Sequence, residues 1–81
     1  MPFFDGKEII YKKSDGSEEH GWFMLTVYGD RSISLQISHV RVHLGTHSSA
    51  PIQVDSDILD RVVWDSKNGV FRADFSGFAR I

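Results

Sequence analysis

Apolar and polar residues alternate along residues 31–44, RSISLQISHVRVHL, and this alternation constrains the fold more than any other feature of the chain. The apolar residues stand at odd positions up to 37 and at even positions from 40 onward. Because successive side chains of a strand point to opposite faces, both sets reach one core only if a residue is inserted between them. We therefore predict one long strand with a bulge near Ser38-His39. The apolar residues facing the core are then Ile33, Leu35, Ile37, Val40, Val42 and Leu44.

The opposite face of this strand changes from neutral polar residues before the bulge to basic residues after it. No acidic residue lies between Asp30 and Asp55. Side chains on one face of a strand recur about every 7 Å, a spacing that suits an extended anion such as a phosphate backbone or an acidic peptide. The alternative is an ordinary solvated face whose charges pair with Asp57 or Asp60. The candidate partner- and anion-binding residues are Arg31, His39, Arg41 and His43.

Three histidines at a spacing of four, His39, His43 and His47, raise the question of a metal site. On a helix this spacing would bring the imidazoles together, but on a strand neighbours in the series are roughly 13 Å apart. The aspartates of residues 55–60 lack the third ligand and the glycine of a calcium-binding EF-hand loop. Cysteine is absent, which removes disulfides and thiolate-bound metals. We expect neither a metal nor a cofactor.

Turn signals divide the rest of the chain into short strands. Residues 7–13 (KEIIYKK) and 22–28 (WFMLTVY) are typical of strands, whereas residues 14–21 (SDGSEEHG) are typical of a polar hairpin loop. Residues 70–81 alternate regularly and predict one further strand, with Phe71 and Phe75 on its apolar face. The turns are expected at Asp15-Gly16, Gly29-Asp30 and Asn68-Gly69.

Residues 55–64 fit two different structures. The apolar residues recur at a helical spacing, which predicts at most one short helical turn near 56–62 with Ser56 or Asp57 as its N-cap. The β-branched residues 62–63 and Trp64 instead favour a strand from about Leu59. Both structures stay open at this point, and the residue types favour the strand.

Together these segments predict an all-β protein: a small antiparallel β-barrel or sandwich of five to seven strands, with a single β domain over residues 1–81. The length of 81 residues suffices for one compact core, and 41% hydrophobic with 25% charged residues is the composition of an ordinary folded domain. No apolar run is long enough to span a membrane, and residues 1–13 do not resemble a signal peptide. We therefore expect a cytoplasmic protein without a membrane partner.

Trp22, Trp64 and Phe78 are the aromatic contact candidates. Phe78 interrupts the polar face of residues 70–81, and an apolar exception on an outer face can mark a contact with another subunit. Tryptophan rings also stack on sugars and bases. The alternative is that these rings fill the core.

The function that these patterns favour is a non-enzymatic binding or assembly module. It would present its Arg/His strand face to an acidic macromolecular partner or to another copy of itself. A net charge of −2 does not favour nucleic acid as the partner. No G-x-S-x-G nucleophile elbow occurs and no pair of acids stands out, so the sequence does not favour an enzyme. The alternative function is a small-ligand carrier, for a carbohydrate or an apolar molecule, with a barrel mouth lined by Trp and Tyr.

Overall fold

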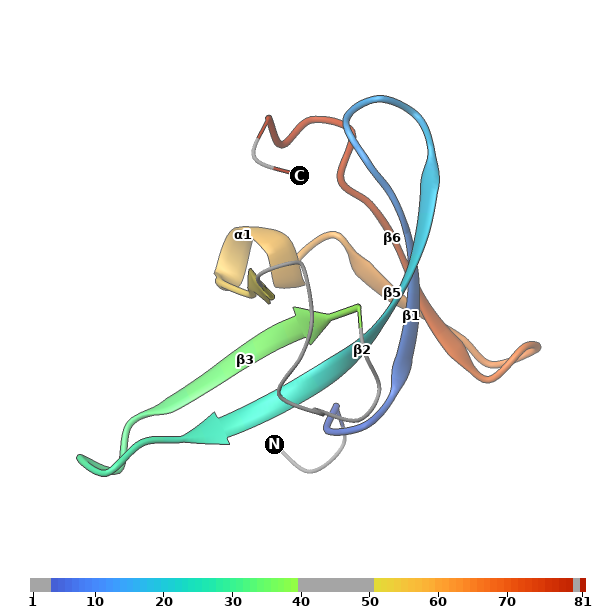
Figure 1. Cartoon of the computed structure of the whole chain (residues 1–81). Helices are drawn as coiled ribbons and strands as arrows, with labels where there is room; N and C mark the ends of the chain where they lie inside the picture. Colours follow the sequence, from blue (N-terminus) through green and yellow to red (C-terminus); the bar gives the residue numbers. More distant parts are fainter. Residues whose placement is uncertain (1–3, 40–50, 80) are drawn as a thin grey trace.

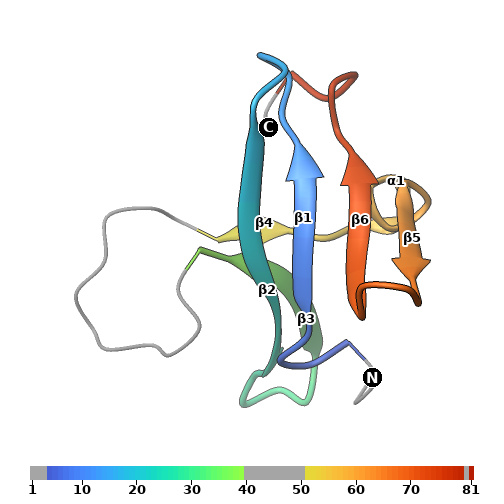
Figure 2. The same ribbon diagram turned by 90° about the vertical axis from the view of Figure 1, so that its right-hand side faces the viewer.

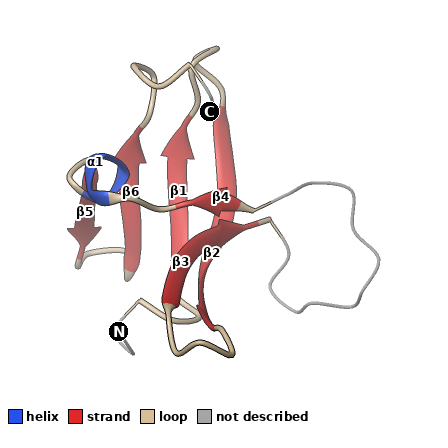
Figure 3. Cartoon of the chain, turned by 90° about the vertical axis from the view of Figure 1, so that its left-hand side faces the viewer, coloured by secondary structure: helices blue, strands red, loops and turns tan. Residues whose placement is uncertain are grey.

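The computed structural model describes residues 4–39, 51–79 and 81. These residues form one sheet of six strands in the order β4-β3-β2-β1-β6-β5 (Figures 1 and 2). One short helix, α1, lies between β4 and β5 in the chain and on one side of the sheet (Figure 3). The elements are β1 (Glu8–Lys12), β2 (Glu18–Val27), β3 (Ile33–Ser38), β4 (Ile52–Gln53), α1 (Ser56–Leu59), β5 (Val62–Asp65) and β6 (Val70–Asp74).

The all-β class, the expected number of strands and the single helical turn are confirmed. Two details of the architecture differ from the expectation. β1 and β6 run parallel, with Ile9 opposite Phe71, so the sheet is mixed rather than antiparallel. β4 and β5 stand at opposite ends of the strand order, so the described strands form an open sheet that is not closed into a barrel. Local alternation identifies strands, but the direction in which two distant strands pair depends on the connection between them.

The core lies on one face of the sheet and is mostly aromatic. Phe23 of β2 and Phe71 of β6 meet edge to face, with ring centroids 5.4 Å apart. Tyr11 of β1 packs on Phe75 at a centroid distance of 5.4 Å. Figure 1 shows α1 on the inner side of the curved sheet. Ile58 of α1 has no exposed surface and belongs to the core. The buried apolar residues are Ile9, Tyr11, Phe23, Ile37, Val54, Ile58, Phe71 and Phe75.

Gly21 lies inside β2, and the prediction of a loop over residues 14–21 is wrong for its second half. The turn closes between Lys13 and Ser17, where the Lys13 N–H donates to the Ser17 carbonyl at 2.8 Å, and β2 starts at the next residue. A Cβ added at Gly21 would lie 2.6 Å from Cγ2 of Ile37 and 3.5 Å from the Tyr11 ring. The glycine therefore lets two core side chains approach the backbone, a contact that no local turn signal reveals.

The helical turn falls within the predicted range of 56–62, but its N-cap is Asp55 rather than Ser56 or Asp57. The Asp55 backbone is extended, with φ −102° and ψ −176°, and its carboxylate accepts a hydrogen bond from the Ile58 N–H at 3.1 Å. This cap places Ile58 toward the core. The following strand begins at residue 62 and not near residue 59, because the turn occupies the residues between.

β6 ends at Asp74, and the prediction of one strand over residues 70–81 is wrong beyond that residue. The Asp74 carboxylate accepts a hydrogen bond from the Ser76 N–H at 2.9 Å, which turns the chain. A second turn follows, in which the Phe78 N–H donates to the Phe75 carbonyl at 2.9 Å. The predicted inward position of Phe75 is nevertheless confirmed, since this side chain has no exposed surface.

The apolar face of β3 is buried toward one end only. Ile37 is fully buried and Leu35 is half-buried, whereas Ile33 is 62% exposed. On the opposite face Ser34 is buried, and its hydroxyl donates to Oε1 of Gln53 in β4 at 3.0 Å. The polar residues of this strand therefore pack against the neighbouring strand instead of forming a continuous solvated face.

β3 ends at Ser38, and His39 follows as a bend. Residues 40–44 lie outside the described residues. The bulge near Ser38-His39 and the second half of the long strand therefore stay predictions.

Candidate functional site

His39 packs against the aromatic core. Its Nε2 is hydrogen-bonded to the Tyr11 hydroxyl at 2.5 Å, and the two rings are stacked with centroids 6.2 Å apart. Tyr11 is 1% exposed. Burial, together with the negative charge of Glu19, raises the pKa of Tyr11 to about 12. The contact satisfies a buried hydroxyl, so His39 has a structural task at this position.

Arg31 lies in the exposed turn between β2 and β3, with φ 70° in the left-handed region. The neighbouring Asp30 carboxylate accepts hydrogen bonds from the Ser32 hydroxyl at 2.6 Å and from the Ser32 N–H at 2.9 Å. These bonds lower the pKa of Asp30. Arg31 therefore lies in a tight turn that is stabilised by hydrogen bonds to the Asp30 carboxylate, and not on a strand face.

The four candidate anion-binding residues are not gathered by the described part of the chain. Arg31 precedes β3 and His39 follows it, so the length of the strand separates them. Arg41 and His43 lie outside the described residues. A basic strip formed by these four residues therefore stays a prediction from the sequence.

The two tryptophans lie on opposite faces of the sheet. Trp22 precedes the core residue Phe23 in β2, so its half-buried ring is on the outer face, the face away from the core, near the His20 ring at 6.4 Å. Trp64 is paired with Phe71 in the neighbouring strand and meets its ring at 4.8 Å on the core side, with 45% of its surface exposed. Trp22 and Trp64 therefore do not line the mouth of one ligand-binding cavity.

Phe78 is half-buried and closes the end of the core. Its ring meets Phe75 edge to face at a centroid distance of 6.1 Å, and Cζ of Arg61 lies 5.2 Å from its centre. The Phe78 ring therefore packs against Phe75 and also lies under the Arg61 guanidinium. It does not stand out from a polar strand face, because the strand has already ended.

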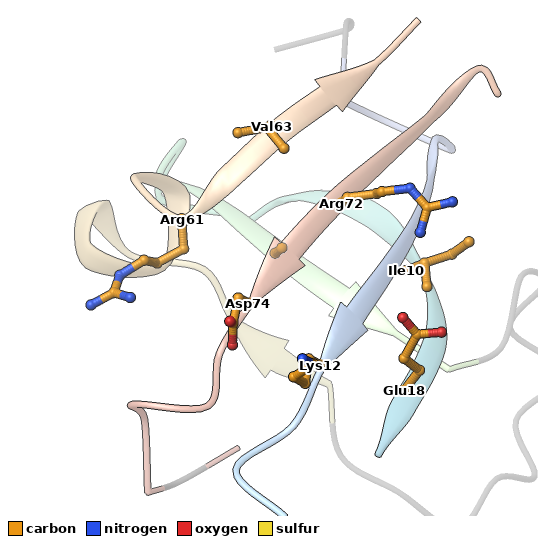
Figure 4. A pocket seen from close by; sticks show the side chains of 8 residues that line it. Ile10, Lys12, Glu18, Arg61, Val63, Arg72 and Asp74 are labelled. Carbon is orange, nitrogen blue, oxygen red and sulfur yellow. The ribbon is translucent and has the colours of Figure 1, made fainter. Parts of the chain in front are cut away.

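The outer face carries a shallow hollow of about 400 Å³ that spans four strands (Figure 4). Cations and carboxylates alternate around it, and Nε of Arg72 lies 2.9 Å from the Asp65 carboxylate nearby. These charges neutralise one another, so the hollow selects no single class of ligand. Sequence reasoning missed it because its residues come from distant strands. They are Ile10, Lys12, Glu18, Arg61, Val63, Arg72, Ala73 and Asp74.

The edge of the sheet at β5 exposes apolar side chains on both of its faces. β5 is last in the strand order, and Figure 2 shows it as the outermost strand. Val63 on the outer face is 62% exposed, and Trp64 on the core side is 45% exposed. Arg61 and Asp65 flank them, two positions on either side of Val63. We call strand β5 with these two flanking charges the β5 edge. The sequence signalled Trp64 but not Val63, whose exposure depends on β5 being at the edge.

A second exposed apolar group lies at the tip of the β2–β3 hairpin. Val27 and Ile33 are cross-strand partners that are 66% and 62% exposed, and Tyr28 is 48% exposed. We call these three residues the hairpin tip. Figure 1 shows this hairpin extending away from α1 and the core.

The carboxylates with altered acidity lie in turns. Hydrogen bonds from Asn68 and Arg72 lower the pKa of Asp65 to about 2. Serine hydrogen bonds lower the pKa of Asp15 and Asp74 in the same way. Among the described residues, no cluster of three or more His, Cys, Asp or Glu side chains is placed to hold a metal ion.

No protein-family model matches the chain, and no similar curated protein or solved structure was found. Within the described ranges, no helix has both the length and the apolar character needed to cross a membrane. The β5 edge and the hairpin tip are the two exposed apolar surfaces described above, and in the β5 edge the exposed apolar residues lie on the last strand of the sheet.

Proposed function

We propose that this protein is a non-enzymatic assembly module whose β5 edge binds a second copy of itself. One observation carries the proposal: the edge strand bears two adjacent exposed apolar residues, Val63 and Trp64, one on each face. An edge strand with such side chains on both faces is a template for pairing with another strand.

The residues that normally prevent edge pairing are absent from the middle of β5. Natural edges are protected by charged side chains, prolines or bulges, and residues 62–64 (VVW) contain none of these. The opposite edge strand, β4, has only two residues. Pairing along β5 would cover apolar surface on both faces of the sheet at once.

A second copy is a better partner for this surface than an acidic macromolecule. The β5 edge carries one cation, Arg61, and one carboxylate, Asp65, so it has no excess of positive charge. A surface with one charge of each sign is complementary to itself after a two-fold rotation. Of the four candidate anion-binding residues, only Arg31 and His39 are described, and Arg31 is exposed whereas His39 is half-buried.

The expected dimer is weak because β5 is short. Stable complexes bury about 800 Å² on each partner. A strand of four residues paired with its copy buries less than this. We expect a dissociation constant on the order of 0.1 mM, which corresponds to about −5.5 kcal/mol.

The test is light scattering coupled to size exclusion, on protein loaded from about 10 μM to about 1 mM to bracket that constant. The wild-type protein should shift from monomer to dimer over this range. Val63→Lys should remain a monomer, because a charge at the centre of the edge opposes pairing. Val27→Lys, equally exposed but on the hairpin tip, is the matched control and should dimerise like the wild type.

Two outcomes would contradict the proposal. A wild-type protein that stays monomeric throughout the range would remove self-association as the function. Loss of the dimer in Val27→Lys, with Val63→Lys unaffected, would assign the interface to the hairpin tip instead.

A further inference from the structure

We infer that the two β5 strands pair in a single register, in which Val63 lies opposite its own copy and Arg61 lies opposite Asp65 of the second copy. This inference rests on the proposed function and specifies how that interface is built. It follows from the symmetry of a dimer, from the alternation of side chains along β5 and from the positions of the two flanking charges.

Symmetry restricts the register first. In a closed dimer the two edge strands run antiparallel around a two-fold axis, and a continuous sheet requires this axis to be perpendicular to it. Such an axis keeps each face of the sheet on the same side. Directly opposed residues must therefore come from the same face, and the axis must lie midway between one residue and its own copy.

Two registers then use most of β5, centred on Val63 or on Trp64. Centring on Val63 places Val62 opposite Trp64 of the second copy, so that an aliphatic side chain covers each exposed indole on the core side. Centring on Trp64 places Val63 opposite Asp65 of the second copy, which sets a carboxylate against an exposed apolar side chain. Burial of apolar surface therefore favours the register centred on Val63.

Charge favours the same register. With Val63 at the centre, Arg61 of each copy lies opposite Asp65 of the other, and the pair occurs twice because of the two-fold axis. Asp65 stays ionised, because hydrogen bonds from Asn68 and Arg72 lower its pKa to about 2. It would bind Arg61 of the second copy in addition to Arg72, whose Nε lies 2.9 Å from it. Opposite charges directly across a strand pair stabilise it, and like charges oppose it.

Arg61 has an exposed side chain in the turn that directly precedes β5. Its backbone N–H donates to the Ile58 carbonyl at 3.0 Å. The Arg61 side chain lies 5.2 Å from the centre of the half-buried Phe78 ring, and its charge adds to the serine hydrogen bonds that lower the pKa of Asp74. Figure 4 shows it beside the same outer hollow as Val63 and at the margin of the sheet. A rotation about its flexible side chain would direct the guanidinium toward the second copy.

Cysteine trapping tests the register directly, because the chain has no cysteine of its own. In the inferred register the two thiols of Val63→Cys are directly opposed, at a Cα separation of about 5 Å that a disulfide accommodates. The thiols of Trp64→Cys would be diagonal neighbours, about 7–8 Å apart. Under mild oxidation Val63→Cys should form a covalent dimer at least several-fold faster than Trp64→Cys. Tyr28→Cys, on the hairpin tip, measures random collision.

Salt dependence tests the charge pair with a matched control. Dimerisation of the wild type should weaken as salt rises, because screening reduces the attraction between Arg61 and Asp65. Arg61→Glu should weaken the dimer roughly tenfold and reverse the trend, since screening then relieves a repulsion. Arg31→Glu changes the net charge equally but lies away from β5, and it should keep the wild-type behaviour.

The outcomes separate the inference from the function on which it rests. A wild type that never dimerises would overturn both. A wild-type dimer in which Trp64→Cys is trapped faster than Val63→Cys, or in which Val63→Cys reacts no faster than Tyr28→Cys, would overturn the register alone. Circular dichroism of each variant confirms that the trapped protein is folded.

Discussion

The centre of the sheet and the β5 edge are built from similar residues but differ in what those residues do. Residues 22–28 and residues 62–64 are both rich in aromatic and β-branched side chains. Phe23 in the centre is 1% exposed, whereas Val63 at the edge is 62% exposed. Among the described strands, β2 has a neighbour on either side and β5 has one neighbour. Position in the sheet, rather than composition, decides whether an apolar side chain is buried. It acts across the strand order and along each strand, since Val27 at the end of the central strand β2 is 66% exposed.

This comparison predicts that the free energy of unfolding and the free energy of association can be changed separately. Changes in the centre should alter the free energy of unfolding, and a change at the exposed Val63 of the β5 edge should alter association while leaving unfolding nearly unchanged.

The largest expected effect is that of Phe23→Ala. Phe23 is buried and meets the rings of Phe4 at 5.1 Å and Phe71 at 5.4 Å. Removing it leaves a cavity in the core and should lower the free energy of unfolding by about 3–5 kcal/mol. Urea unfolding followed by circular dichroism measures this loss. An equal loss in Trp64→Ala would break the distinction between centre and edge.

Gly21→Ala should be the next most destabilising change. The added methyl group would lie 2.6 Å from the Ile37 side chain and 3.2 Å from the Ser38 carbonyl oxygen, so the packed centre must shift. We expect a loss of about 1–3 kcal/mol in the free energy of unfolding. Gly77→Ala is the matched control, because a Cβ there meets nothing within 4 Å. Equal stability of the two variants would show that the centre adapts freely.

Tyr11→Phe should cost about 1 kcal/mol at neutral pH, because the hydrogen bond to His39 is lost while the ring is kept. Urea unfolding of the wild type and of Tyr11→Phe should give the same difference in the free energy of unfolding at several protein concentrations, since Tyr11 is remote from the β5 edge.

The same variant predicts a pH dependence. The pKa of Tyr11 is raised to about 12, above the ordinary value of about 10. The stability linked to the protonated hydroxyl is therefore complete below about pH 10 and is lost as the pH rises toward 12. Tyr11→Phe should lack this alkaline loss, whereas Tyr28→Phe, at an exposed tyrosine, should retain it. An identical alkaline loss in both variants would contradict a buried, protonated Tyr11.

The smallest expected effect on unfolding is that of Val63→Lys. Its side chain is largely exposed, so the free energy of unfolding of the monomer should change by less than about 0.5 kcal/mol. Thermal unfolding at low concentration, where the protein is monomeric, measures it. A loss comparable to that of Gly21→Ala would mean that β5 stabilises the fold instead of serving as an interface.

Local patterns were sufficient for several elements. Asn68-Gly69 predicts the β5–β6 hairpin, which is confirmed, with Gly69 at φ 68°. The antiparallel pairing of β2 with β3 across the turn at Gly29-Asp30 is also confirmed. In each case the turn residues and the neighbouring strands lie next to each other in the chain, so short-range chemistry decides the structure.

The sequence indicated only one of the two exposed apolar residues of the β5 edge. Trp64 was selected because it is a large aromatic residue, but nothing local distinguishes Val63 from the half-buried Val62 beside it. His39 was assigned to an outward basic strip, and its contact with Tyr11 joins residues 28 positions apart in the chain. Such contacts depend on which segments pack together.

The sequence by itself determined that this chain is an all-β domain, where most of its strands and hairpins lie, and that Phe71 and Phe75 face inward. The alternation of side chains and the turn residues act over a few positions and are sufficient for this. Only the tertiary structure decided that β6 pairs in parallel with β1, that Gly21 belongs to a strand, and that β5 is left at the edge. Those outcomes follow from burying one shared core, and that burial is a property of the whole sheet.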